Sequence, residues 1–118
     1  MKPAPFTYHR PQSIDAVCDL LADLEDAELM AGNQSLGIVM ANRLATPDHI
    51  IDLSFVEELA FIESNDERIE IGSMTTHRTI EHSALLADAL PIMPEAAEQI
   101  AGPSVRNRGT LGGSIAEA

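Results

Sequence analysis

Two glycine-containing segments combine residue types that could bind a phosphate group. Residues 31–35 read AGNQS directly after an expected strand, and residues 109–114 read GTLGGS. Glycine reaches backbone conformations with positive φ and lets a ligand approach the main chain, and successive amides in such a turn can donate to phosphate oxygens. Gln34 and Ser35 add side-chain donors, and the second segment adds two hydroxyls. Together the two segments indicate a diphosphate ligand.

Each segment also has a plainer interpretation. The first could be an ordinary turn from a strand into a helix that Ser35 caps, and the second a flexible turn near the end of the sequence. The second segment is neither a Walker loop, which needs Lys before Ser or Thr, nor a G-x-G-x-x-G turn. Neither segment contains a base or nucleophile, so no catalytic residue is expected.

The composition limits the class of protein and of partner. The chain has 118 residues, of which 45% are hydrophobic and 22% charged, as in an ordinary folded domain. Nineteen acidic residues against seven basic ones give a net charge of -12, which excludes nucleic acids and anionic membranes as default partners. An acidic, lysine-poor surface also fits a halophilic protein, which we state as a hypothesis.

The cysteine content and the apolar runs bear on location. Cys18 is the single cysteine, so neither an intramolecular disulfide nor a cysteine-based metal site is possible. No apolar run approaches the roughly 18 residues of a membrane span, and no signal-peptide pattern opens the sequence. These observations predict a cytoplasmic protein that does not insert into membranes.

The first half of the sequence has the pattern of a small α/β layer. Strands are expected at 6–8, 28–31 and 49–53, and residues 38–44 are expected to form a helix or an irregular packed segment. A helix is expected after Ser13, whose hydroxyl can cap it. Its apolar face contains, at helical spacing, Ile14, Val17, Cys18, Leu21 and Leu24.

The second half predicts a hairpin followed by helices. Residues 59–62 and 68–71 flank a polar turn, 75–90 look helical, and Met93 begins a second amphipathic helix that Gly102 and Pro103 end. The residues from 104 onward contain the glycine-rich turn at 109–114, and a helix could begin at Ser114. The sequence stops shortly after this glycine-rich turn, which suggests a fragment.

Other polar residues have bland interpretations. His77 and His82 are five positions apart, which is wrong for two ligands on one helical face, so solvent-facing or capping roles are expected. Arg106 and Arg108 could neutralise a diphosphate or a partner's acidic edge, or pair with nearby carboxylates. Cys18 is expected to pack inside the protein.

Three motifs occurring in order carry a resemblance to a known family. They are 31–36 (AGNQSL), 72–77 (GSMTTH) and 105–116 (VRNRGTLGGSIA), preceded by a Pro-x-x-Phe-x-Tyr pattern at the start. The sequence resembles the N-terminal part of the FAD-binding medium subunit of molybdenum hydroxylases, of the carbon monoxide dehydrogenase type and related to the flavin domain of xanthine dehydrogenase. It departs from the usual family pattern at Asn33, Ile38 and Glu117.

The resemblance implies an α+β fold with two small α/β subdomains of the vanillyl-alcohol-oxidase-like (PCMH-type) FAD-binding fold. The first subdomain would be 1–55, and 56–118 would begin the second, which is incomplete. The implied cofactor is FAD. No residue is expected to bind a metal ion. The residues implied to bind FAD, mainly through backbone amides and short hydroxyls, are Ala31, Gly32, Asn33, Gln34, Ser35, Leu36, Thr110, Leu111, Gly112, Gly113 and Ser114.

The resemblance further implies electron transfer through the flavin, between a 2Fe-2S small subunit and an external acceptor, while a molybdenum-cofactor large subunit oxidises the substrate. The cofactor, rather than a side chain, would supply the redox chemistry. The alternative is a truncated, non-catalytic domain that does not bind flavin and serves as an assembly module.

Overall fold

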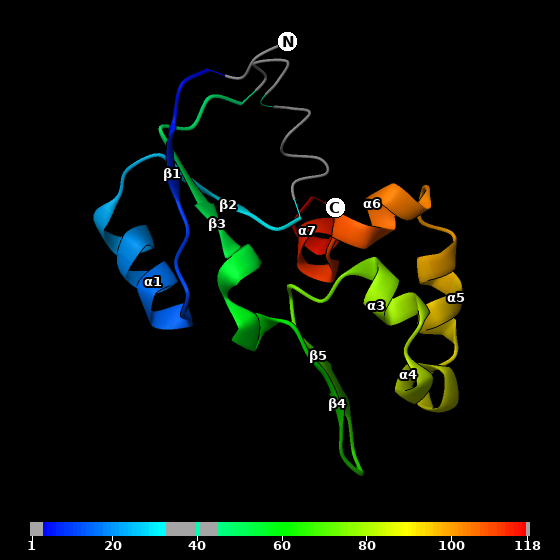
Figure 1. The fold of residues 1–118 in the computed structure, drawn as a ribbon. Helices are drawn as coiled ribbons and strands as arrows, with labels where there is room; N and C mark the ends of the chain where they lie inside the picture. Colours follow the sequence, from blue (N-terminus) through cyan, green and yellow to red (C-terminus); the bar gives the residue numbers. More distant parts are fainter. Residues whose placement is uncertain (1–3, 33–39, 41–44, 118) are drawn as a thin grey trace. The chain divides into compact units, whose positions relative to one another are not determined.

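The protein was analysed as a computed structural model that describes residues 4–32, 40 and 45–117. The chain divides into two compact units, Met1–Glu58 and Leu59–Ala118 (Figure 1). Both units combine helices with strands, which agrees with the expected α+β class. In the described ranges, no helix is both long and apolar enough to cross a membrane.

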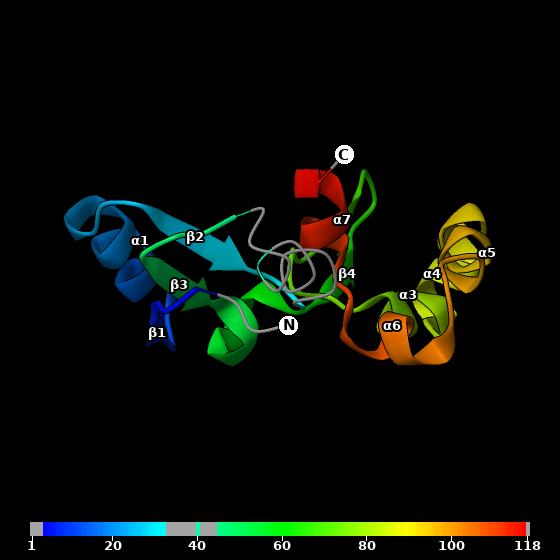
Figure 2. The same ribbon diagram turned by 90° about the horizontal axis from the view of Figure 1, so that it is seen from above.

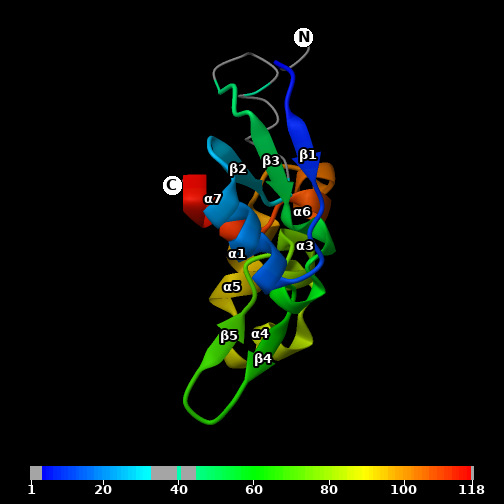
Figure 3. The ribbon, with the colours of Figure 1, turned by 90° about the vertical axis from the view of Figure 1, so that its left-hand side faces the viewer.

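The first unit is built on a parallel sheet with the strand order β1-β3-β2. Its strands are β1 (Thr7–His9), β2 (Ala27–Met30) and β3 (His49–Asp52), close to the expected ranges. The central strand β3 is the most buried, since Ile50 and Ile51 are at most 1% exposed. A helix lies against one face of this sheet (Figure 3). Because Ile50 and Ile51 are consecutive, they point to opposite faces of the sheet, and β3 is apolar on both.

That helix is α1 (Ile14–Asp23), and it begins as predicted. The Ser13 hydroxyl accepts a hydrogen bond from the Ala16 amide at 3.1 Å, which caps the first turn. The apolar face is less buried than its pattern predicts: Val17 is buried, whereas Leu21 is 43% exposed. Cys18 is exposed as well. The prediction that Cys18 packs inside is wrong: the buried residue of α1 is Val17, and Cys18 lies one position (about 100°) further round the helix.

A short 3₁₀ turn follows the sheet. It is η1 (Leu53–Phe55), and Asp52 at the end of β3 caps it by accepting from the Ser54 amide at 2.9 Å. The Tyr8 hydroxyl on β1 donates to the other oxygen of the same carboxylate. The expected packed segment at 38–44 lies outside the described residues apart from Met40, which is helical and buried.

The second unit begins with the predicted hairpin, whose strands are β4 (Ile62–Ser64) and β5 (Ile69–Ile71) (Figure 3). The strand before the turn starts later than expected, since Leu59 belongs to the 3₁₀ turn η2 (Glu57–Leu59). The pairing continues irregularly beyond β5. The Gly72 amide donates to the Phe61 carbonyl at 2.8 Å, and the Met74 amide donates to the Leu59 carbonyl at 2.9 Å.

The single helix predicted over 75–90 is two helices, α3 (His77–Glu81) and α4 (Ala84–Ala89). The break has a local cause: the Ser83 hydroxyl accepts from the Leu86 amide at 3.2 Å, and so starts a new helix. α5 (Ile92–Glu98) begins one residue earlier than expected and ends before Gly102. Figure 2 shows α3, α4 and α5 grouped together.

These helices and the hairpin enclose the core of the second unit. Ile80, Leu86 and Ala97 are its buried residues, at most 3% exposed. Hydrophobic side chains from both hairpin strands and from the helices pack against them, namely Ile62, Ile69, Ile71, Leu85, Met93 and Leu111. Burying a side chain such as Ile80 or Leu86 stabilises the fold by about 2 kcal/mol.

The last part of the chain is helical, and most of the expected glycine-rich turn belongs to its last helix. Its helices are α6 (Pro103–Arg108) and α7 (Leu111–Glu117). Pro103 occupies the first turn of α6, where its missing N–H costs nothing. Glycine-rich sequence favours loops locally, but tertiary contacts at Gly109–Gly112 override that preference in α7.

Candidate functional site

The first predicted loop follows β2 immediately. Gly32 has φ of 85°, a left-handed conformation that favours glycine over residues with a side chain. It is one of the backbone conformations that glycine was expected to allow at that position. Ala31 is also described, whereas Asn33, Gln34, Ser35 and Leu36 lie outside the described residues.

The second predicted loop forms the start of α7, and its amides are already hydrogen-bonded within the chain. The Leu111 amide donates to the Thr75 carbonyl at 3.0 Å, and the Gly112 amide donates to the Ser73 carbonyl at 2.8 Å. The next two amides, of Gly113 and Ser114, both donate to Thr110: one to its hydroxyl and one to its carbonyl, at 3.1 Å each. The expectation that a row of free amides faces a phosphate here is therefore wrong for these four groups.

Gly112 has a structural reason to be glycine. A Cβ built on it would lie 2.8 Å from the Ser73 carbonyl oxygen and 2.9 Å from the Ser73 Cβ. Gly72, at the start of the same turn, is in a similar position, because a Cβ there would lie 2.1 Å from the Leu59 carbonyl oxygen. The two glycines let the turn at 72–75 approach the backbone closely on both sides, at Leu59 and at Gly112.

The side chain of Ser114 is positioned by His77. Ser114 is exposed on α7, and its Oγ lies 2.9 Å from Nε2 of His77, the first residue of α3. The backbone of His77 also contacts this region, since its amide donates to the Gly109 carbonyl at 2.9 Å. His77 therefore contacts the glycine segment at its first residue, Gly109, and at its last, Ser114.

His77 is buried, with 4% of its surface exposed, so the expected solvent-facing or capping role is wrong. Burial lowers the pKa of His77 below its usual 6.5, because the charged imidazolium loses hydration. The neighbouring residue, Thr76, carries a local sequence signal for the start of this helix. The Thr76 hydroxyl accepts from the Thr79 amide at 3.1 Å and caps α3, which fixes His77 as the first helical residue.

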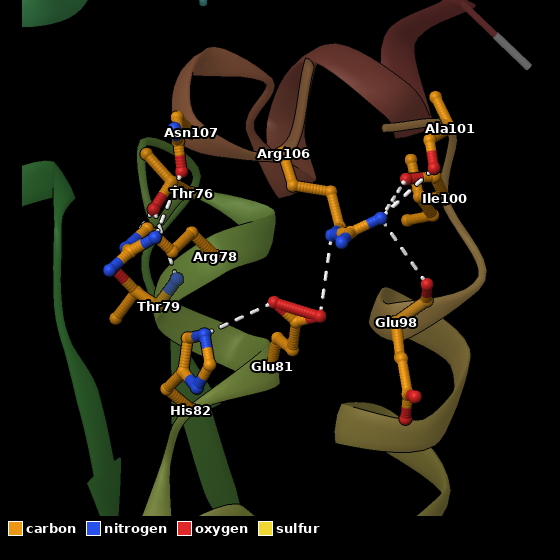
Figure 4. A network of polar contacts seen from close by, with 10 residues as sticks. All are labelled: Thr76, Arg78, Thr79, Glu81, His82, Glu98, Ile100, Ala101, Arg106 and Asn107. Atoms are coloured by element: carbon orange, nitrogen blue, oxygen red, sulfur yellow. Dashed lines mark hydrogen bonds and ion pairs between the residues drawn. The ribbon is translucent and has the colours of Figure 1, made fainter. Parts of the chain in front are cut away.

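The two arginines of α6 have different surroundings. The stretch is helical, so residues two apart point about 200° from each other rather than to one face. Arg106 pairs with Glu81, with Nε 3.3 Å from Oε2, and its Nη1 donates to the carbonyls of Glu98, Ile100 and Ala101 (Figure 4). Arg108 is exposed. For Arg106, pairing with a nearby carboxylate is the alternative that the structure supports.

Negative charge is absent from the segments that carry the expected motifs. All nineteen carboxylates lie outside four stretches, 1–14, 29–47, 71–80 and 99–116. Six of the seven Lys and Arg residues lie inside those stretches. A protein with a net charge of -12 thus keeps both glycine segments and the 72–77 turn free of acidic residues. Such a distribution favours an anionic ligand at these segments.

Comparison with known proteins assigns the family. Residues 4–118 match the model of a family described as the FAD binding domain in molybdopterin dehydrogenase. The chain belongs to this family. The resemblance read from the three motifs is confirmed, and FAD is the cofactor of this domain family.

Relatives of this FAD-binding domain are subunits of larger enzymes. The chain is 47% identical to the nicotine 6-hydroxylase medium subunit of Paenarthrobacter nicotinovorans, over 98% of this chain and 41% of that subunit. It is 43% identical to the carbon monoxide dehydrogenase medium chain of Hydrogenophaga pseudoflava, over 98% of this chain and 41% of that one. The chain therefore spans about two-fifths of the length of these relatives.

Solved structures of such enzymes also match nearly the whole of this chain. The quinoline 2-oxidoreductase of Pseudomonas putida 86 has 41% sequence identity and a TM-score of 0.97, covering 100% of this chain and 41% of that one. Carbon monoxide dehydrogenase from Hydrogenophaga pseudoflava has 43% identity and a TM-score of 0.92, covering 98% and 41%.

The described residues fit a flavin dinucleotide in two respects. Gly32 has the left-handed backbone that allows close approach of a ligand, and Ser114 offers an exposed hydroxyl that a buried histidine holds in place. Both lie in stretches that lack carboxylates, which suits the negative diphosphate of FAD. In the glycine segment at 109–114, four amides are hydrogen-bonded within the chain, whereas the Ser114 side chain is exposed.

Proposed function

We propose that this chain is the FAD-binding N-terminal portion of the medium subunit of a cytoplasmic molybdenum hydroxylase. In this proposal 1–55 and 56–118 belong to the two subdomains of the PCMH-type flavin fold. FAD, when bound, supplies reversible electron transfer. The single observation that carries the proposal is the family match over residues 4–118, which includes both glycine segments.

The proposed contacts follow from the residues in each segment. Gly32 admits a close approach of the ligand to the backbone after β2, and the segment from Asn33 to Leu36 supplies amide and hydroxyl donors. In the second segment, Thr110 caps α7 and Gly112 lets α7 approach the 72–75 turn, so that Ser114 is presented to the ligand. Leu111 and Gly113 belong to the same first turn of the helix.

The proposed partners are those of the family. The medium subunit would pass electrons between a 2Fe-2S small subunit and an external acceptor, and a molybdenum-cofactor large subunit would oxidise the substrate. Support comes from the relatives, which are named as the medium subunit of a nicotine 6-hydroxylase and the medium chain of a carbon monoxide dehydrogenase. The 47% and 43% identities extend over nearly the whole of this chain.

Titration of the full chain with FAD tests the proposal. A ligand that binds the native state raises the melting temperature, by an amount that grows with its concentration relative to Kd. We expect a concentration-dependent rise in Tm, quenched flavin fluorescence and a protein that is yellow after removal of free FAD. Riboflavin, which lacks the diphosphate, is the control and should bind far more weakly. An unchanged Tm at saturating FAD would instead favour the flavin-free assembly module.

A further inference from the structure

We propose that His77 is a positioning residue for FAD: its Nε2–H donates to Ser114 Oγ, so that the Ser114 hydroxyl proton points outward to an oxygen of the FAD diphosphate. This inference rests on the proposed function and deepens it. His77 would act through Ser114 and would not touch the cofactor itself.

The geometry gives His77 control over this hydroxyl. Its Nε2 is 2.9 Å from Ser114 Oγ, and its ring is enclosed, at 4% exposure. The same residue holds the Gly109 carbonyl through its backbone amide, and its neighbour Thr76 forms an antiparallel bridge with Thr110. The ring therefore sits in a fixed frame, and the exposed Ser114 side chain is its partner.

The chemistry of the hydroxyl makes the direction of this hydrogen bond decisive. A serine hydroxyl has one proton to donate and two lone pairs that accept. If Nε2 accepted the hydrogen bond, the Ser114 hydroxyl would donate its proton to His77. Only its lone pairs would then face the solvent, and these repel a phosphate oxygen. If Nε2–H donates, the Ser114 proton is free for the ligand.

The protonation state of the ring limits the alternatives. Burial lowers the pKa of His77, so the ring is neutral at neutral pH and has a single N–H. A neutral ring must choose between its two nitrogens. Binding of an anion that accepts from Ser114 therefore selects the tautomer with the proton on Nε2.

A set of variants in the full chain tests this proposal through the Kd for FAD, followed by flavin fluorescence. Ser114→Ala removes the hydroxyl and His77→Met replaces the ring by an apolar side chain of similar size; each should weaken FAD binding by roughly tenfold or more, the typical effect of losing a hydrogen bond to a charged group. His77→Gln keeps an N–H donor near the Nε2 position and should retain most of the affinity. His82→Met, at the exposed end of α3, is the matched control and should leave Kd unchanged.

The double variant separates positioning from general damage to the fold. If His77 acts through Ser114, His77→Met should add little to the loss already caused by Ser114→Ala. A full additional loss in the double variant, or equal Kd values for His77→Gln and His77→Met, would overturn the proposal. Unchanged Kd in all variants while the wild type binds FAD would overturn it and leave the proposed function standing. A wild type that binds no FAD overturns both.

A spectroscopic measurement on the unmutated protein covers the case in which His77→Met does not fold. The nitrogen NMR shifts of a neutral imidazole distinguish its two tautomers. We expect the FAD-bound protein to show His77 protonated on Nε2. A proton on Nδ1 in the FAD-bound state would refute the proposal.

Discussion

The guanidinium Nε of Arg106 lies 3.3 Å from Oε2 of Glu81, and these two side chains are only 13% and 16% exposed. This ion pair joins α6 to α3. The other oxygen of the Glu81 carboxylate lies 3.2 Å from Nε2 of His82. Arg106 also reaches the carbonyls beyond α5, including that of Ala101, whose φ of 41° is unusual for a residue with a side chain. Arg106 thus links α6 to α3 through the ion pair and to the end of α5 through its hydrogen bonds.

Arg106→Met should destabilise the fold by about 3 kcal/mol, because it removes the ion pair and leaves the largely buried Glu81 carboxylate without its arginine partner. Urea unfolding measures this change. Arg108→Met is the control on the same helix; its side chain is exposed, so its effect should stay within about 0.5 kcal/mol. Equal effects of the two substitutions would contradict the assigned role of Arg106.

Gly112→Ala should destabilise the protein by about 1–3 kcal/mol, although alanine is the better helix former by about 1 kcal/mol. The new Cβ would lie 2.8 Å from the Ser73 carbonyl oxygen, so backbone has to move. Gly102→Ala is the control, since a Cβ there meets nothing within 4 Å. Thermal unfolding of both variants measures the difference. A Gly112→Ala protein as stable as Gly102→Ala would contradict a steric clash at Gly112.

Tyr8→Phe should cost about 1–2 kcal/mol, because Asp52 loses a donor to its carboxylate. The hydrogen bond to Asp52, followed by burial and the Asp52 charge, raises the pKa of Tyr8 above 10.0, against a smaller opposing effect of Arg10. The raised value means that this stabilisation is present below about pH 10 and is lost as the pH rises through the folded-state pKa.

Tyr8 is the only tyrosine and the chain has no tryptophan, so its titration can be followed directly by tyrosinate absorbance. We expect half-titration above pH 10 in the folded protein and close to the ordinary value of about 10 in urea. Asp52→Asn should move the folded-state value toward that of the unfolded chain. Identical titration curves with and without urea would show that the contact with Asp52 is absent in solution.

Acid should weaken the fold through His77. Its pKa is lowered from 6.5 in the folded state, so the unfolded chain binds a proton more readily. Stability is therefore complete above about pH 6.5 and falls as the pH decreases below that value toward the lower folded-state pKa. His77→Gln should flatten the dependence of the urea midpoint on pH in this range, whereas His82→Gln should not. If both variants keep the slope of the wild type, His77 is not its source.

The elements with local signals were predictable from the sequence. Ser13 caps α1 as expected, and the Ile69 and Ile71 alternation gives β5. Where the prediction failed, a contact distant in sequence or a competing cap decided the outcome. Ser83 divides the expected helix at 75–90, and α7 forms because the amides of Leu111 and Gly112 find carbonyls at Thr75 and Ser73.

In the candidate site, too, the features with local signals were predictable and those that depend on distant contacts were not. The left-handed backbone at Gly32 follows from the residue type and its position after a strand. The occupied amides of the second segment and the burial of His77 depend on how α3 and the 72–75 turn pack against α7, and local sequence preferences carry no information on that packing. The cap at Thr76 could have placed His77 at the start of α3, but not its burial.

The turn at 72–75 lies between two backbone strips, one from 59–61 and one from 110–112. Its Gly72 and Met74 amides donate to one strip, and its Ser73 and Thr75 carbonyls accept from the other. The amide hydrogens of Gly72 and Met74, and those of Leu111 and Gly112, should therefore exchange with deuterium in a single cooperative opening. A molecule that immobilises Ser114 would then slow isotope exchange at Gly72 and Met74, so that the base of the hairpin reports occupancy of a distant hydroxyl.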